Sequence, residues 1–278
     1  MHCTSFRAST HQVPHGVTGE VKRKMTQTIE DGPSPQTHVG TAGIITVAAS
    51  KGGVGKTTIA SELAYLLGAV LVDLDWDRGG VSRSWGYRHE ARKTAPLLDA
   101  LESGRTPRPL RARFRADLVP SHPDFANNQP AADDLASELE RWAGEWNRLV
   151  VVDTHPGGVP STYGAVAAAR LVVVPAPLAT KELEALEGTV DELRDYPLLV
   201  VPNKVPRIPR ARDIERLESI ARSADVPVGP AVSDYSWLGH RQRRMAVSAV
   251  EPVPLRSQGF VDEMREIAKA VATYVLGG

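Results

Sequence analysis

The residues from Gly43 to Thr58, GIITVAASKGGVGKTT, constrain the fold of this chain more than any other stretch. A short apolar run rich in β-branched residues, Ile44 to Ala49, leads directly into the glycine-rich segment Lys51 to Thr58. Beyond this segment, apolar residues recur at helical spacing: Ile59, Leu63, Leu66 and Leu67. A strand, a glycine-rich loop and a helix in this order are typical of a loop that binds phosphate groups.

The loop offers the groups that a nucleoside triphosphate requires. Three glycines allow successive backbone N–H groups to converge on one anion, because glycine has no Cβ atom. The helix that follows points its positive N-terminal end at the same phosphates. We expect Lys56 to reach the β and γ phosphates and the Thr57 hydroxyl to bind Mg²⁺. The predicted nucleotide-binding residues of the loop are Gly52, Gly53, Val54, Gly55, Lys56, Thr57 and Thr58.

Two later apolar runs end on carboxylates. Residues 69–74, AVLVDL, lead into Asp75, and residues 149–153, LVVVD, end on Asp153. Parallel strands deliver their C-terminal residues to the edge of an open α/β sheet at which ligands bind. An aspartate in that position forms a Walker B arrangement, so Asp153 is predicted to hold Mg²⁺ opposite Thr57. The alternative for the first acidic pair is that it only caps the next turn.

The sequence KGGVGKTT, with a second lysine at Lys51, resembles the deviant Walker A motif of the ParA/MinD family of ATPases. The resemblance extends over about residues 43–278 and implies ATP and Mg²⁺ as ligands. It also implies that Lys51 reaches across a nucleotide-sandwich dimer to the partner's phosphates. Asp75 would orient the attacking water, and Asp73 would lie beside the Mg²⁺. The implied catalytic residues are therefore Lys51, Lys56 and Asp75.

A further site residue is implied by the same resemblance. Asn203 follows the apolar run Leu198 to Val201 at the place where related ATPases recognise the adenine edge. The alternative for Asn203 is an ordinary turn residue.

The chain departs from the family pattern in two loops. Where the family continues D-P-Q-G, this chain has Asp75-Trp76-Asp77-Arg78, which leaves the rate of hydrolysis open. Where the family has D-x-P-P, His155 replaces the first proline. We interpret His155 as a structural residue.

Basic residues gather in two late clusters, although the chain as a whole is neutral, with 33 basic and 33 acidic residues. A neutral protein binds DNA through such patches, whose phosphate contacts carry affinity without sequence choice. ParA proteins are similar in placing DNA-binding residues on late loops and helices, and a solvated surface is the alternative reading. The predicted DNA contacts are Lys204, Arg207, Arg210, Arg212, Arg241, Arg243 and Arg244.

The overall pattern predicts an α/β fold, a mostly parallel twisted sheet with helices on both faces. Expected elements include a solvent-facing edge strand over residues 108–120, a helix with Thr180 as its N-cap and a closing amphipathic helix that packs on the sheet. A last strand is expected over residues 226–232, and the resemblance implies that Val232, Ser233 and Asp234 line the adenine pocket. Residues 41–278 are expected to form one ATPase domain. The polar residues 1–40 are expected to be a disordered tail, and Met25 is an alternative start that would leave residues 1–24 outside the native protein.

The sequence also bears on location and function. No apolar run approaches the roughly 18 residues that span a bilayer, and Cys3 alone cannot build a disulfide framework. We therefore expect a cytoplasmic protein. The resemblance to ParA proteins implies a nucleoid-associated partition ATPase that dimerises on ATP, binds duplex DNA non-specifically and answers to a centromere-binding partner. The alternatives are a membrane-associated positioning ATPase like MinD and an ATP-gated DNA-binding scaffold with negligible turnover.

Overall fold

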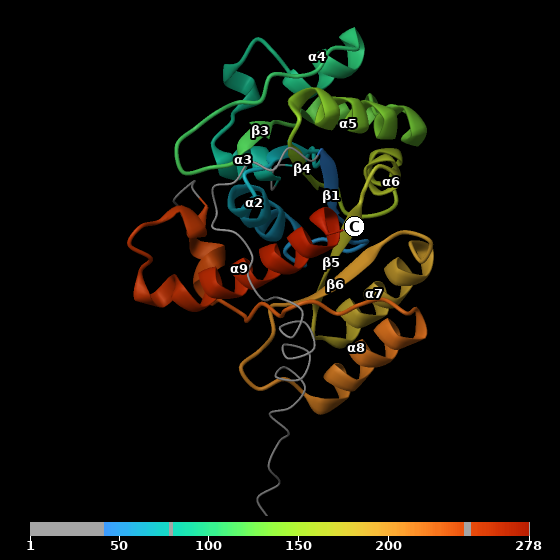
Figure 1. Ribbon diagram of the computed structural model, residues 1–278, viewed down its shortest axis with the longest axis vertical. Helices are drawn as coiled ribbons and strands as arrows, with labels where there is room; N and C mark the ends of the chain where they lie inside the picture. The colour runs from blue at the N-terminus through green and yellow to red at the C-terminus, as the bar shows by residue number, and fades with distance from the viewer. Residues whose placement is uncertain (1–41, 78–79, 242–245, 278) are drawn as a thin grey trace, which may run out of the picture.

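The computed structural model describes residues 42–77, 80–241 and 246–277, so the predicted tail 1–40 lies outside the described residues. A single sheet of six parallel strands runs in the order β3-β2-β4-β1-β5-β6 (Figure 1). The strands are β1 (Gly43–Val47), β2 (Val70–Asp73), β3 (Asp117–Val119), β4 (Leu149–Asp153), β5 (Leu171–Pro177) and β6 (Leu198–Asn203). This confirms the predicted parallel sheet.

Helices cover both faces of the sheet (Figure 1). The α-helices are α2 (Lys56–Leu66), α3 (Val81–Trp85), α4 (Pro96–Ser103), α5 (Ala132–Trp146), α6 (Pro160–Ala167), α7 (Thr180–Glu192), α8 (Ala211–Ser223) and α9 (Leu255–Leu276). Single turns of 3₁₀ helix are η1 (His89–Ala91), η2 (Pro123–Asn127), η3 (Ser236–His240) and η4 (Val247–Ala249). Within the described residues, no helix is both long and apolar enough to cross a membrane.

Alternate residues of the central strand face opposite layers, as the period of a strand requires. Ile45 and Val47 pack with α2 and α9, whereas Ile44 packs with α5. The predicted packing of the closing helix on the sheet is confirmed, because the apolar stripe of α9 is buried with α2 against the face of the sheet that Ile45 and Val47 occupy. Helices α7 and α8 cover the β5–β6 end of the second face.

Three local expectations differ from the structure. Residues 108–120 contain only the short edge strand β3, joined to Leu110 by an antiparallel bridge at Leu118. Residues 226–232 contain one isolated bridge, at Val228, and no strand, because Pro227 and Pro230 lack the N–H donors that a ladder needs. Thr180 is the first residue of α7, and its expected role as the N-cap is taken by Ala179 without a side-chain bond.

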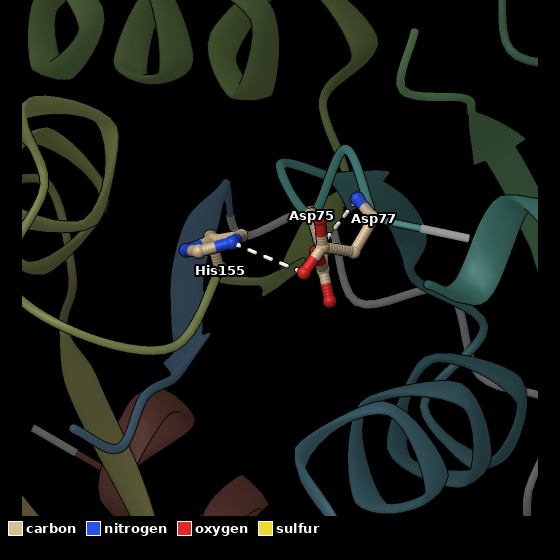
Figure 2. Close-up of side chains that lie close together, drawn as sticks. All are labelled: Asp75, Asp77 and His155. Atoms are coloured by element: carbon tan, nitrogen blue, oxygen red, sulfur yellow. Dashed lines mark hydrogen bonds and ion pairs between the residues drawn. The ribbon is translucent and has the colours of Figure 1, made fainter. Parts of the chain in front are cut away.

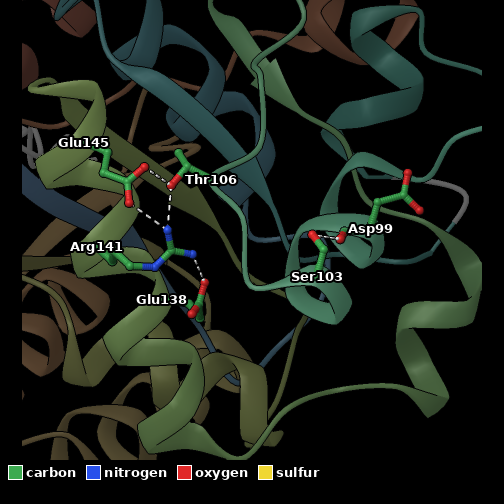
Figure 3. A network of polar contacts seen from close by, with 6 residues as sticks. All are labelled: Asp99, Ser103, Thr106, Glu138, Arg141 and Glu145. Carbon is green, nitrogen blue, oxygen red and sulfur yellow. Dashed lines mark hydrogen bonds and ion pairs between the residues drawn. The ribbon is translucent and has the colours of Figure 1, made fainter.

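A polar network joins α5 to the segment that follows α4 (Figure 3). The Arg141 guanidinium donates to the Thr106 hydroxyl at 2.8 Å, to Glu145 at 2.8 Å and to Glu138 at 2.5 Å. These groups are partly exposed, so we assign the network to orientation of the segment more than to stability.

Glu62 lies on α2, is 2% exposed, and joins this helix to η4. Its two carboxylate oxygens accept the backbone N–H groups of Val247 at 2.6 Å and Ser248 at 3.0 Å. Burial raises the pKa of Glu62, and these hydrogen bonds oppose that rise. The buried carboxylate therefore fixes the segment around η4 to the helix that begins at the phosphate-binding loop.

Replacing Glu62 with alanine is expected to lower the free energy of unfolding by about 2–4 kcal/mol, because two buried N–H donors lose their acceptor. Urea unfolding of the full chain measures this change. Glu184→Ala on the exposed side of α7 is the matched control and should stay within about 0.5 kcal/mol. Equal stabilities for the two variants would contradict the role given to Glu62.

Candidate nucleotide-binding site

The glycine-rich loop joins β1 to α2 at the C-terminal edge of the central strand. Gly53 and Gly55 have φ values of 76° and 102°, a left-handed region that side chains rarely adopt. A Cβ atom on Gly55 would also lie 2.2 Å from the Asn203 amide nitrogen. Glycine is therefore required at position 55 by both conformation and space.

Lys56 occupies the first turn of α2 and is 5% exposed. Its ammonium lies 3.5 Å from the Lys51 carbonyl oxygen. Burial lowers the pKa of Lys56, while the charges of Asp153 and Asp75 oppose this shift. A buried cation facing two carboxylates at a helix N-terminus is suited to an incoming anion.

Asp153 ends β4 directly beside β2 and β1, in register with Asp73 and Val47. Its side chain is fully buried, and neither carboxylate oxygen has a hydrogen-bond partner among the described residues. Burial and the neighbouring Asp73 raise the pKa of Asp153 well above its ordinary value, and the nearby Thr57 hydroxyl offsets part of that rise without forming a well-aligned bond. Two orphaned oxygens beside a hydroxyl fit the oxygen ligand set that Mg²⁺ prefers.

Asp73 is also fully buried, but its oxygens are already engaged. One oxygen accepts the Ser82 N–H at 2.7 Å and the Ser82 hydroxyl at 2.5 Å, and the other accepts the Asp75 N–H at 3.0 Å. The carboxylate thus holds the start of α3 against the end of β2. The predicted place of Asp73 beside Mg²⁺ stays a prediction.

Burial raises the pKa of Asp73 from its ordinary value of 3.8 to about 7. The folded chain therefore binds this proton more tightly than the unfolded chain does. The stability that Asp73 contributes is complete below pH about 4 and is lost as the pH rises through about 7, a difference worth about 4 kcal/mol.

In the absence of Mg²⁺, we expect wild type to lose stability relative to Asp73→Asn between pH 4 and pH 8, because asparagine does not ionise. The slope of the difference with pH is the informative quantity, since the amide also changes the hydrogen bonds to Ser82. Thermal unfolding of both chains across this range measures it. Parallel curves would contradict the raised pKa.

Lys51 points away from the loop and pairs with an acid of α7. Its ammonium lies 2.5 Å from a carboxylate oxygen of Glu182, and the two side chains are 37% and 26% exposed. The hydrogen bond to Lys51 lowers the pKa of Glu182. The structure therefore pairs the Lys51 ammonium with Glu182 and leaves its side chain partly exposed.

Two residues at the end of β6 contact the loop. The Asn203 amide donates to the Val54 carbonyl at 2.6 Å, and the Lys204 ammonium donates to the Gly53 carbonyl at 2.7 Å. The charged end of Lys204 thus lies at the phosphate-binding loop, and its predicted contact with DNA remains a prediction. Asn203 holds the loop here, and its predicted contact with adenine remains a prediction.

A cavity of about 930 Å³ adjoins the loop. The loop glycines, Lys56, Thr57 and Asp75 line one part of it, together with Asn203. Ser233 and Asp234 line it as well, so the cavity brings the loop together with the segment expected near adenine. Its size, and the mixture of apolar and charged groups along its wall, are appropriate for a nucleotide.

Asp75 lies just beyond β2 and is half-buried. One of its oxygens accepts the Asp77 N–H at 3.0 Å. Burial raises the pKa of Asp75, and the His155 and Lys56 charges oppose this shift. The charge of Asp75 therefore acts on the pKa values of both Lys56 and Asp153, which places Asp75 beside the groups that would hold the phosphates and Mg²⁺.

The predicted DNA-contacting arginines are only partly described. Arg207, Arg210 and Arg212 are exposed, on the loop after β6 and at the start of α8. Arg241 is half-buried and lines the cavity, whereas residues 243 and 244 lie outside the described residues. Among the described residues, fewer of the predicted DNA-contacting arginines are therefore fully exposed than the sequence suggests.

These features define a nucleotide-binding domain. Residues 45–234 match the family model of the CobQ/CobB/MinD/ParA nucleotide binding domain, which is more than half of the chain, and the chain belongs to this family. It is 34% identical over 159 residues to the chromosome-partitioning ATPase Soj of Thermus thermophilus, over 54% of this chain and 62% of Soj. A second relative, from Mycobacterium tuberculosis, is covered to 60%, so the chain spans about three fifths of the curated relatives it matches.

Solved structures show the same fold. Apo McdA of Cyanothece superposes with a TM-score of 0.65 at 19% identity, over 84% of this chain and 98% of McdA. The cell division ATPase MinD of Pyrococcus furiosus superposes with a TM-score of 0.65 at 18% identity, over 83% of this chain and all of MinD. Likeness at these identities concerns the fold alone.

Sequence reasoning missed Glu182, Ser82 and Glu62. Glu182 lies 131 residues from Lys51 in the chain, and Glu62 lies 185 residues from Val247. No local pattern distinguishes these acids from others on amphipathic helices, so only the fold identifies their partners.

Proposed function

We propose that this chain is an ATP-dependent partition ATPase that dimerises on ATP and binds duplex DNA non-specifically. The observation that carries the proposal is the buried pair of unpartnered Asp153 oxygens, which faces Thr57 and Lys56 at the phosphate-binding loop. Membership of the MinD/ParA nucleotide-binding family and the likeness to Soj support the same function.

The chemistry needs positioning and charge neutralisation more than covalent catalysis. Thr57 and Asp153 would hold Mg²⁺, which neutralises charge on the phosphate oxygens when bound. The loop N–H groups and Lys56 bind the phosphates, and Asp75 accepts a hydrogen bond from the attacking water and orients it. Asn203 would contact the adenine edge from its place above Gly55.

Dimerisation is assigned to Lys51. Its side chain is directed to the protein surface, so it is available to phosphates held by a second chain once it leaves Glu182. An ion pair as exposed as this one is worth at most about 1 kcal/mol, so a triphosphate can displace Glu182 readily. Hydrolysis then removes the γ-phosphate that Lys51 holds, and the two chains separate.

The DNA surface is assigned to Arg207, Arg210 and Arg212, which are exposed on the loop before α8 and at its start. In this account the protein is cytoplasmic, associates with the nucleoid, and answers to a centromere-binding partner protein. A scaffold with little turnover is the second candidate, favoured by the contact between the Asp75 loop and His155.

Co-sedimentation with duplex DNA tests the proposal. Binding is expected with ATP and magnesium and is expected to be lost at roughly 0.5 M salt, because the contacts are to phosphates. The double variant Arg207→Ala/Arg210→Ala should weaken it, whereas Arg265→Ala on α9 should not. Equal binding to DNA with and without nucleotide would contradict the dependence of DNA binding on an ATP dimer. Phosphate release from ATP distinguishes the ATPase, which releases phosphate, from the scaffold with little turnover.

A further inference from the structure

Two loops at the ligand edge of the sheet meet through an aromatic stack. Trp76 follows β2, and His155 follows β4. Their rings are 3.9 Å apart between centroids and inclined by 6°, and Phe125 meets the indole edge-on at 6.0 Å. The stack fixes the plane of the imidazole, and with it the direction of both ring nitrogens.

The surroundings of His155 determine where its proton lies. Its Nδ1 is 2.7 Å from the Pro156 carbonyl oxygen, which can only accept, so Nδ1 carries the hydrogen. In the neutral ring, Nε2 then presents a lone pair to the Asp77 carboxylate oxygen 3.4 Å away (Figure 2). Nε2 and this carboxylate oxygen are therefore placed to share a cation, either a second proton on the ring or a metal ion between the two atoms.

A third ligand atom lies at the same place. Asp75, Asp77 and His155 each contribute one nitrogen or carboxylate oxygen, and these atoms all lie within 4.8 Å of one another. Metal–ligand bonds of about 2.0–2.2 Å in a tetrahedral site separate two ligand atoms by roughly 3.4 Å. The spacing between His155 and Asp77 matches this value, whereas the widest separation in the cluster, up to 4.8 Å, must shorten when a metal ion binds.

We propose that Asp75, Asp77 and His155 form a binding site for a divalent transition-metal ion, specifically Zn²⁺. One imidazole and two carboxylates suit zinc, whereas Mg²⁺ takes oxygen ligands. Metal-bound histidines characteristically donate their second ring nitrogen to a carbonyl or carboxylate, as His155 does to Pro156. Three protein ligands leave a fourth position for water or substrate.

This site differs from the one assigned to Mg²⁺, which uses Thr57 and Asp153. A metal ion held by both loops would join the segment after β2 to the segment after β4. It would also engage Asp75, and, on the proposed function, Asp75 is then withheld from the attacking water. Zinc therefore acts as an inhibitor of hydrolysis and favours a long-lived ATP-bound state.

Calorimetric titration of the full, nucleotide-free chain with Zn²⁺ in excess magnesium tests the site. We expect one zinc per chain to bind with an affinity that His155→Gln and Asp77→Asn each weaken at least about tenfold. His122→Gln is the matched control, since its ring also faces an aspartate, with Nδ1 3.5 Å from Asp124. Zinc binding that is absent, or equal in wild type and both site variants, would overturn the proposal.

Two further readouts separate the site from the proposed function. Co²⁺ should quench tryptophan fluorescence in wild type, because the site adjoins Trp76, and should quench much less in His155→Gln. Phosphate release should be inhibited by zinc in wild type and resist zinc in Asp77→Asn. No phosphate release without zinc would refute the ATPase and leave the binding result standing, whereas equal inhibition of both chains would refute the inhibitory role.

Discussion

Replacing Lys56 with alanine is expected to lower ATP hydrolysis roughly 10²–10³-fold, the loss typical of removing one preorganised positive group from a transition state. The reason lies in the position of Lys56, which is buried at the start of α2 and faces Asp153 and Asp75. Its removal therefore leaves the γ-phosphate charge uncompensated in a buried place. Phosphate release under saturating ATP and magnesium measures the loss.

Lys269→Ala on α9 is the control for Lys56, because this lysine is exposed and pairs with Glu266 at 2.9 Å on the helix surface. It should keep wild-type hydrolysis. The Lys56 variant should melt close to wild type without nucleotide, since the cost of burying the charge is removed together with its attraction to Asp153 and Asp75. Hydrolysis within a few fold of wild type in Lys56→Ala would contradict the site.

Replacing Lys51 with alanine is expected to keep nucleotide binding and to abolish dimerisation. Lys51 lies outside the loop cavity and pairs with Glu182, so its loss leaves the phosphate-binding groups of its own chain in place. Hydrolysis should fall with the dimer. Calorimetry with ATP and light scattering of the same samples measure the two properties separately.

A substitution of Glu182, the ion-pair partner of Lys51, is expected to favour dimerisation instead of preventing it. Glu182→Gln removes the charge that holds Lys51 in the single chain, so dimerisation should occur at up to about fivefold lower ATP concentration, the equivalent of 1 kcal/mol. A variant that dimerised less readily than wild type would show that Glu182 supports the dimer instead of opposing it.

Much of the fold follows from local sequence. The strands β1, β2, β4, β5 and β6 are short runs of Val, Ile and Leu, and buried parallel strands require this composition. The glycine-rich loop could be predicted because its backbone requires residues without a Cβ atom. Gly55 is an example, since a Cβ atom there would collide with Asn203. The strand predicted over residues 226–232 is absent because the segment has the apolar composition of a strand, but its two prolines cannot donate the hydrogen bonds of a ladder.

The candidate site divides in the same way. Lys56 and Asp153 could be predicted because each is tied to a strand end or a helix start. The engagement of Asp73 with Ser82, of Lys204 with Gly53 and of Lys51 with Glu182 depends on elements distant in sequence. The stack of Trp76 on His155 joins two departures from the family pattern that look independent along the chain.

In the proposed cycle, ATP closes two chains over a shared site through Lys51. Sedimentation of the full chain with ATP and magnesium, with ADP and magnesium, and without nucleotide tests it most directly. The mass of wild type should double with ATP and magnesium and in neither of the other two conditions. Lys51→Ala should remain a monomer while still binding ATP. A wild-type mass that is unchanged by ATP, or a Lys51→Ala chain that doubles as wild type does, would contradict the account.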